Sequence, residues 1–200
     1  MRKKAIAFAL ALVLVSTVAL AQEWYGEGNA AFALPSDERT APRGKAEAAS
    51  TAPVSTCDGG SASLKTEEKR VLDLHNAVRK KHGLGSLCVD PALTRAARAH
   101  SKEMIGKGYF RHESFDGETV GARLKRFSYD WTASGENIAW GAGSMSRPDD
   151  RFKGWMESPG HRANILNGVF REVGVGTASG DPKKTGEQVM YTVDFGSRRG

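Results

Sequence analysis

Apolar residues between positions 66 and 81 recur every three or four positions, which is the spacing of one face of an α-helix. We therefore predict a helix over residues 66–81, with Thr66 as its cap and Gly83 as its stop. The stripe expected to be buried consists of Val71, Leu74 and Val78.

A second helix is predicted over residues 90–106. Asp90 provides a cap, and Pro91 occupies the first turn, where a backbone N–H has no partner inside the helix. Two shorter helices are expected over residues 119–126 and 148–156. The expected buried face of the second helix consists of Leu93, Ala97, His100 and Met104.

The strand pattern comes late in the chain. Residues 172–178 and 189–195 alternate apolar and polar positions around a polar loop, which predicts an antiparallel hairpin. A third strand is expected around Ile138. Gly174 and Gly176 inside the first of these strands indicate that a neighbouring layer approaches closely. Helices followed by strands favour an α+β layered domain over alternating βαβ units.

The N-terminus has the layout of a secretory signal peptide. Three basic residues precede the apolar run 5–15, and Ala19-Leu20-Ala21 is a small-x-small cleavage site. We predict a signal peptide over residues 1–21 and a secreted or periplasmic protein. An uncleaved membrane anchor is the alternative, because about 17 apolar residues is the short limit for a bilayer span.

The next segment differs in composition from the rest of the chain. Residues 22–62 are rich in Ala, Ser, Thr, Gly and Pro without a sustained apolar period, which predicts a flexible spacer. Residues 63–200 then form one domain of ordinary size. This domain holds 23 basic and 17 acidic residues. The excess favours anionic envelope polymers or lipid headgroups as partners, or it is an ordinary solvated face. The scattered positions argue against nucleic acid.

Two cysteines follow the predicted signal peptide, Cys57 and Cys88. An even count in an exported chain predicts one disulfide, with two free thiols as the alternative. Closing a loop of about 32 residues would stabilise the fold by about 3–4 kcal/mol in the chain-entropy model.

Candidate chemistry gathers in the second half of the chain, where two histidines and a carboxylate stand on separate elements. His112, Glu136 and His161 are the residues concerned, each beside aromatic or small residues that could wall a cavity. Two imidazoles and one carboxylate suit Zn²⁺ with an open fourth position. The alternative is a buried hydrogen-bond network that fixes loops to the sheet.

A longer series of motifs accompanies these residues. In order they are Leu74-His75-Asn76 with Arg79, Gly83-Leu84, Leu87, Asp90, Leu93, His100-Ser101, His112, Gly135-Glu136-Asn137-Ile138-Ala139, Trp155, Ser158-Pro159-Gly160-His161-Arg162 and Gly174-Val175-Gly176. This series resembles the bacterial branch of the CAP (SCP) superfamily, which includes cysteine-rich secretory proteins, insect antigen 5 and plant pathogenesis-related proteins. The resemblance covers residues 64–196. It implies a three-layer α-β-α sandwich with a central antiparallel sheet, and a cleft that binds a divalent metal in some members.

The resemblance also implies roles for individual residues. His112 and His161 match the two cleft histidines, and Glu136 matches the glutamate of the GEN motif. A further glutamate of animal and plant relatives falls on Ser158 here, three residues after the core tryptophan and about 60° from it around a helix. Glu157 should face solvent instead. We therefore expect a three-residue cluster with Ser158 at its rim.

Three functions are compatible with these observations. The first is a binding module whose His/Glu cleft holds a divalent metal such as Zn²⁺ or a small ligand, without a defined catalytic activity. The second is an extracellular hydrolase that uses a metal-activated water, or Ser158 or Ser114 as nucleophile with His112 or His161 as base. The third is an interaction protein at the envelope, monomeric and bound to an anionic polymer, a lipid or a small hydrophobic ligand. The chain has no Gly-x-Ser-x-Gly and no HExxH motif.

Overall fold

The computed structural model describes residues 50–181 and 186–198. All of the described residues belong to one compact unit of the chain. The predicted signal peptide and residues 22–49 of the predicted spacer lie outside the described residues. In the described ranges, no helix has the length and apolar character needed to cross a membrane.

The described elements form a layered domain. In chain order they are β1 (Thr51–Ser55), β2 (Ser61–Lys65), α1 (Thr66–Lys81), β3 (Cys88–Val89), α2 (Pro91–Lys107), α3 (Val120–Arg126), β4 (Ala133–Ala142), η1 (Gly143–Ser146), α4 (Pro148–Glu157), α5 (Pro159–Ile165), β5 (Glu172–Gly180) and β6 (Gln188–Ser197). Among these, α5, η1 and the short strands β1, β2 and β3 go beyond the sequence-based prediction, which located the other helices and strands.

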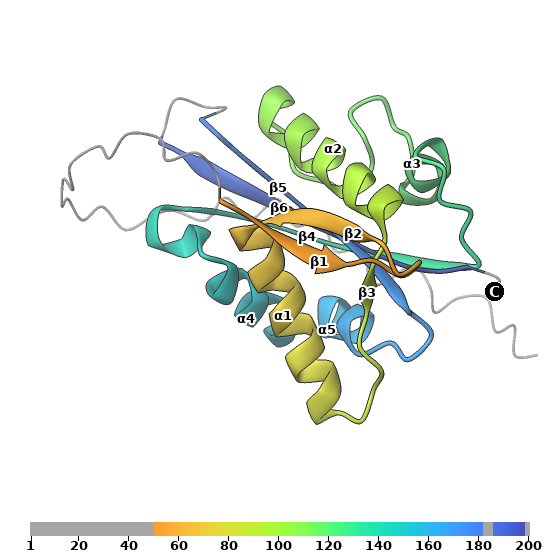
Figure 1. Cartoon of the computed structure of the whole chain (residues 1–200). Coiled ribbons are helices and arrows are strands. Elements are labelled where there is room, and N and C mark those ends of the chain that lie inside the picture. Colours follow the sequence, from red (N-terminus) through yellow and green to blue (C-terminus); the bar gives the residue numbers. More distant parts are fainter. Residues whose placement is uncertain (1–49, 182–185, 199–200) are drawn as a thin grey trace, which may run out of the picture. The chain divides into compact units, whose positions relative to one another are not determined.

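The main sheet has the strand order β3-β5-β6-β4. Strand β6 pairs antiparallel with both β5 and β4, and the two residues of β3 pair parallel with β5. Helices α2 and α3 cover one face of this sheet, and α1, α4 and α5 cover the other (Figure 1). The predicted three-layer α-β-α sandwich is confirmed, with a central sheet that is antiparallel apart from β3.

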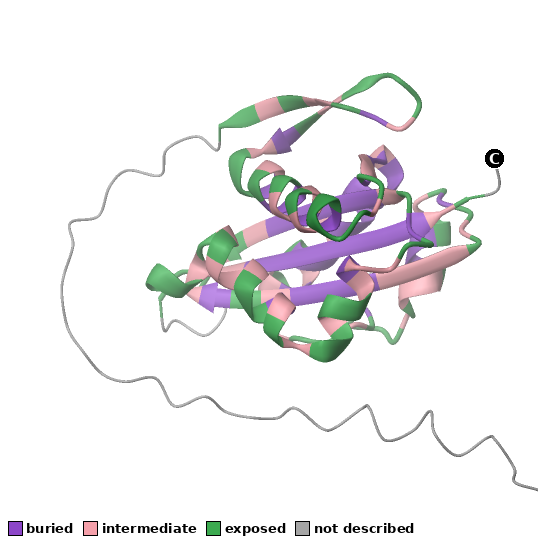
Figure 2. Cartoon of the chain, turned by 90° about the horizontal axis from the view of Figure 1, so that it is seen from below, coloured by how far each residue is buried: buried purple, intermediate pink, exposed green. Residues whose placement is uncertain are grey.

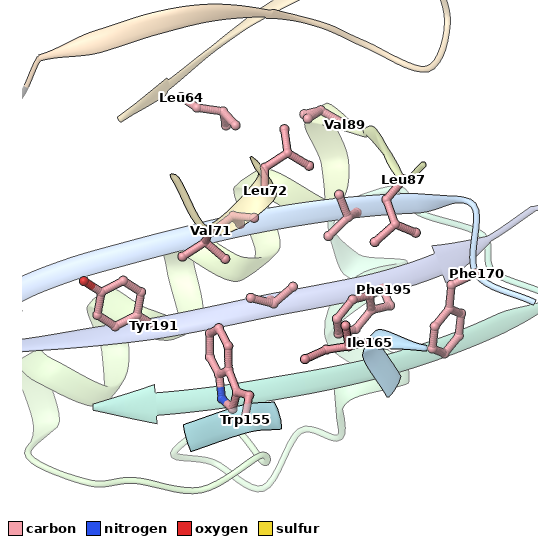
Figure 3. Close-up of a cluster of buried hydrophobic side chains, with 13 residues drawn as sticks. Leu64, Val71, Leu72, Leu87, Val89, Trp155, Ile165, Phe170, Tyr191 and Phe195 are labelled. Carbon is pink, nitrogen blue, oxygen red and sulfur yellow. The ribbon is translucent and has the colours of Figure 1, made fainter. Parts of the chain in front are cut away.

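Strand β6 is buried along most of its length because helices cover both faces of the sheet (Figure 2). Its side chains Tyr191 and Phe195 pack with Trp155 of α4 and Ile165 of α5 in the largest core cluster (Figure 3). On the opposite face the Thr192 hydroxyl lies 2.8 Å from that of Ser101 on α2. The predicted alternation is therefore confirmed, and the second face is also buried, with Met190 on the same face as the polar Thr192 and Asp194.

Glycines let α2 lie directly on the sheet. A Cβ atom at Gly174 of β5 would lie 2.1 Å from the backbone carbonyl carbon of Leu93, and one at Gly176 would lie 2.2 Å from that of Ala97. Real Cβ contacts are essentially never shorter than 3.0 Å. The predicted close approach is confirmed, and only a residue without a side chain permits it at these two positions.

Helix α1 has the predicted bounds but a different cap. The backbone N–H of Lys65, which precedes the helix, donates to the Glu68 carboxylate at 2.9 Å. The Thr66 hydroxyl, predicted as the cap, donates instead to the Ser50 carbonyl at 3.0 Å. A carboxylate in the first turn also lies favourably in the field of the helix dipole.

The buried face of α1 is more polar than predicted. Val71 is buried, but Leu74 and Val78 are only half-buried, and their places in the core are taken by residues that include His75 and Arg79. Carbonyls of other segments accept hydrogen bonds from Arg79, whereas the His75 ring bonds to the Val71 carbonyl of its own helix and packs against aromatic rings of other elements. The fully buried Glu68 forms an ion pair with Arg98 of α2.

The buried His75 ring should make the domain sensitive to acid. The ring packs against Phe152, Trp155 and Phe195, and burial lowers the pKa of His75 to about 4. An unfolded histidine titrates near pH 6.5, so the unfolded state binds the proton first as the pH falls. The contribution of the neutral ring is complete above pH 6.5 and is lost progressively towards pH 4.

We therefore expect the free energy of unfolding to fall by about 2–3 kcal/mol through His75 alone between about pH 7.5 and 4.5. The measurement is urea unfolding of the wild type and of His75→Phe across this range. Because other histidines also titrate, the quantity to compare is the acid-induced loss in each protein. Equal losses in the two proteins would contradict the assignment.

The end of the predicted spacer is ordered, which corrects the prediction of a flexible segment up to residue 62. Strands β1 and β2 form an antiparallel hairpin. The predicted disulfide is confirmed between Cys57 in the hairpin turn and Cys88 of β3, with their Cα atoms 5.1 Å apart. Leu64 of β2 is fully buried in the main core. Backbone pairing, a covalent link and the packing of Val54 and Ala62 against this core order a segment whose composition is low in apolar residues.

Candidate functional site

The candidate site lies at β4, one of the two edge strands of the main sheet in the described part of the chain. Glu136 belongs to β4, His112 to the loop after α2, and His161 to α5. Helix α5 is fastened to β4 by side-chain amides: Asn137 donates to the His161 carbonyl at 3.0 Å, and Asn164 donates to the Glu136 carbonyl at 3.1 Å. Because β4 has a neighbour on one side only, groups from both helical layers can approach it there.

Both carboxylate oxygens of Glu136 are engaged. Oε1 accepts a hydrogen bond from Nδ1 of His112 at 2.7 Å, and Oε2 accepts one from the Arg123 guanidinium of α3. The side chains of Glu136 and Arg123 are each 1% exposed. Burial alone would raise the pKa of Glu136, but the His112 hydrogen bond and the Arg123 charge hold that pKa below its usual value. The group is therefore a buried carboxylate with fixed orientation.

Arg123 is a residue of the site that the sequence did not indicate. Besides Glu136, its guanidinium donates to the His112 carbonyl at 3.0 Å. It thus fixes both the carboxylate and the loop that carries the imidazole. An arginine on a short helix normally faces solvent, and nothing in its neighbouring residues signals a buried partner.

A second carboxyl group lies beside Glu136. Asp194 of β6 is opposite Glu136 in the register of the antiparallel pair and is fully buried. Burial, followed by the charge of Glu136, raises the pKa of Asp194 well above its usual value. Asp194 is therefore favoured as the neutral acid, which allows two acids to be neighbours without mutual repulsion.

His161 is held by its own local partner. Its Nδ1 lies 2.9 Å from the Ser158 hydroxyl, one turn earlier in the chain. Burial, and then the electrostatic influence of His112, lower the pKa of His161. The imidazole is therefore favoured in its neutral form and is close enough to His112 to interact with it.

The remaining candidates are placed as follows. Ser158 lies at the junction of α4 and α5, with its hydroxyl beside the His161 ring. Glu157 is 68% exposed and faces solvent, as expected. Ser114 is 3% exposed, and its hydroxyl is hydrogen-bonded to Arg123 and Glu118, which leaves it poorly placed as a nucleophile.

The predicted metal-ligand set fits this arrangement only in part. In the described ranges, no three His, Cys, Asp or Glu side chains are grouped so that they could hold a metal ion. Each oxygen of Glu136 already accepts one hydrogen bond, from His112 and from Arg123, so Glu136 is less available as a ligand than the two imidazoles. The two imidazoles are better placed than Glu136 to bind a metal. In both rings Nδ1 is hydrogen-bonded, while Nε2 has no hydrogen-bond partner in the described part of the chain.

The fold agrees with a comparison of the chain with known families. The model of the cysteine-rich secretory protein (CAP) family matches residues 72–195. The chain belongs to this family. The match contains every candidate site residue named above.

Bacterial proteins are among the similar sequences and structures. The chain is 39% identical over 140 residues to the uncharacterized protein YkwD of Bacillus subtilis, covering 70% of this chain and 52% of that protein. An extracellular protein containing an SCP domain from Bacillus anthracis is 34% identical, with a TM-score of 0.57, over 66% of this chain and 40% of that one. The chain thus spans about half of these relatives or less.

A more distant structure supports the fold alone. An outer surface protein of Borrelia burgdorferi has a TM-score of 0.56 at 19% identity. The alignment covers 75% of this chain and the whole of the Borrelia chain.

Proposed function

We propose that the chain is an exported CAP-domain binding module that holds a divalent cation such as Zn²⁺ between Nε2 of His112 and Nε2 of His161. The observation that carries this proposal is that both imidazoles are oriented through Nδ1, by Glu136 and by Ser158, and keep Nε2 without a partner among the described residues. Ligating histidines are usually oriented in this way through their second nitrogen.

In this proposal Glu136 is a positioning residue rather than a ligand. Its carboxylate accepts the Nδ1–H of His112, which fixes the tautomer and makes Nε2 the more basic nitrogen. Arg123 keeps the carboxylate charged and in place. Zinc sites ordinarily use three or four protein ligands, so two imidazoles would form a weak site whose other positions take water or a ligand group.

Zinc titration of the purified chain by calorimetry tests the proposal. We expect the wild type to bind zinc, and the double variant His112→Ala/His161→Ala to bind it at least about tenfold more weakly. His82→Ala is the matched control, because it removes an exposed imidazole just after α1 and should bind zinc like the wild type. Equal zinc binding by the double variant and the wild type would refute the cation site.

The hydrolase alternative has less support. A Ser-His-acid triad needs one imidazole that contacts both a serine and a carboxylate. Here His112 contacts a carboxylate, and His161 contacts a serine. In the described residues no single histidine has both partners, so we assign no catalytic activity.

Export is supported by three observations. The N-terminal sequence has the form of a signal peptide. The disulfide between Cys57 and Cys88 is typical of oxidising compartments. The Bacillus anthracis relative is described as extracellular. We accordingly propose a secreted or periplasmic location, where a basic domain would meet anionic envelope polymers.

A further inference from the structure

Two segments that contain no acidic residue meet beside α1 and α5, on one side of the main sheet (Figure 1). Residues 74–89 run from α1 to the end of β3, and residues 158–171 contain α5 and the loop that leads to β5. The Arg79 guanidinium joins them, because it donates to the Gly85 carbonyl of the first segment and to the Phe170 carbonyl of the second. The lysines and arginines of the two segments, which we call the basic cluster, are Arg79, Lys80, Lys81, Arg162 and Arg171.

The positive charge of the basic cluster has no acidic partner among the described residues. The acids that flank the two segments are paired with bases outside them: Asp73 with Lys69, Glu157 with Lys153, and Asp90 and Glu172 with Arg198. The other ion pairs of the described ranges also involve bases outside the cluster. The cluster therefore keeps its full positive charge.

Arg79 contributes a buried charge to this region. Its side chain is fully buried, and its hydrogen bonds go to neutral backbone carbonyls rather than to a carboxylate. Burial, followed by the positive charge of Arg171, lowers the pKa of Arg79. Because salt and water screen a buried charge less than an exposed one, the region should attract anions.

The exposed members of the basic cluster point in different directions. Lys80 and Lys81 are both exposed and are neighbours in α1, so their side chains project about 100° apart around the helix. Arg162 and Arg171 are also exposed, and Arg162 belongs to a different helix. One small anion cannot contact all of these side chains, whereas a flexible chain of repeated negative groups can contact several at once.

The residue types favour phosphate groups without attached bases or acyl chains. Arginine and lysine both bind phosphate oxygens, and arginine can do so through two parallel hydrogen bonds. A single-stranded nucleic acid would also use exposed aromatic side chains to stack its bases, but the only Phe, Tyr or Trp of the two segments is Phe170, which is 3% exposed. Membrane-binding surfaces usually present Trp, Phe or Leu, and the one exposed large apolar side chain here is Val169.

We propose that the basic cluster is a docking surface for a linear polymer of the cell envelope that carries repeated phosphate groups. The location of the polymer rests on the export proposed above, whereas the charge complementarity does not. Each contact with a phosphate releases counterions, so binding should weaken steeply as the salt concentration rises. No member of the cluster is a proposed cation ligand.

The test is calorimetry of the purified chain with long-chain inorganic polyphosphate. The variant Lys80→Gln/Lys81→Gln/Arg162→Gln neutralises exposed members of the cluster. It leaves Arg79 and Arg171 in place, because their guanidinium groups hold backbone carbonyls.

The matched control is Arg95→Gln/Lys102→Gln/Lys125→Gln. It removes the same charge from exposed positions of α2 and α3, which cover the opposite face of the sheet. Circular dichroism of both variants verifies the fold.

We expect the wild type to bind polyphosphate and to lose at least about tenfold in affinity between about 50 and 200 mM salt. The cluster variant should bind at least about tenfold more weakly than the wild type, and the control should lose less than about threefold. The double variant His112→Ala/His161→Ala should bind polyphosphate like the wild type, so that failure of the cation site and failure of this surface are distinguished.

Absence of polyphosphate binding by the wild type at low salt would overturn the proposal. Equal losses in the cluster variant and the control would do so as well, because binding would then depend on net charge alone. Tighter binding, at equal charge concentration, to phosphatidylglycerol vesicles, oligothymidylate or poly-L-glutamate would identify a membrane, a nucleic acid or a polycarboxylate as the partner instead.

Discussion

Replacing Gly176 with alanine is expected to lower the free energy of unfolding by about 3 kcal/mol or more. The added Cβ would lie 2.2 Å from the backbone carbonyl carbon of Ala97 and 2.5 Å from its oxygen. These are backbone atoms of α2, so no side chain can rotate away and the whole helix would have to move off the sheet. That movement would disturb the main-chain and side-chain contacts along the α2 face.

Chemical unfolding monitored by circular dichroism measures this effect. The matched control is Gly154→Ala in α4, where an added Cβ meets nothing within 4 Å. Alanine is the better helix former by about 1 kcal/mol, so the control should be neutral or slightly stabilising. If Gly176→Ala differed from the wild type by less than about 0.5 kcal/mol, the close contact between α2 and β5 would be wrong.

Replacing Arg79 with methionine is expected to cost about 4 kcal/mol of stability. The guanidinium is fully buried, and burial lowers the pKa of Arg79. Methionine retains much of the apolar stem but leaves the accepting carbonyls without their donor. The side chain donates, at distances of 2.9–3.1 Å, to the backbone carbonyls of Gly85, Ile165, Asn167 and Phe170.

The comparison for this prediction is Lys80→Met, the exposed neighbour on the same helix. It also removes a positive charge, but no buried carbonyl depends on it, so the change should stay within about 0.5 kcal/mol. Urea unfolding of the two variants gives the difference directly. Similar stabilities for the two variants would show that the Arg79 hydrogen bonds contribute little to the fold.

These carbonyls also show why sequence periodicity misjudged α1. The pattern of apolar residues located the helix correctly, but it assigned Leu74 and Val78 to the buried stripe. In the structure Arg79 and His75 are more deeply buried. Arg79 donates hydrogen bonds to carbonyls distant in the sequence, and the His75 ring packs against aromatic rings. Periodicity reports the apolar side chains of one segment, whereas the partners that permit a polar side chain to be buried come from other segments.

The same limit applies to the candidate site. The sequence singled out His112, Glu136 and His161, and the structure joins the first two by a hydrogen bond of 2.7 Å. It could not indicate that Arg123 would take the second oxygen of Glu136. That contact supports the proposal that Glu136 orients His112 rather than binding a metal itself.

The sequence by itself determined the longer helices, the three long strands, the disulfide and the family, because each depends on local spacing, on capping residues or on motifs in a fixed order. Only the tertiary structure decided which polar groups are buried and which atoms they satisfy. The hydrogen bonds of Glu136, Arg79 and His100 join residues from different segments, and the net stability of such contacts depends on burial and geometry. Neither quantity exists until the chain has folded.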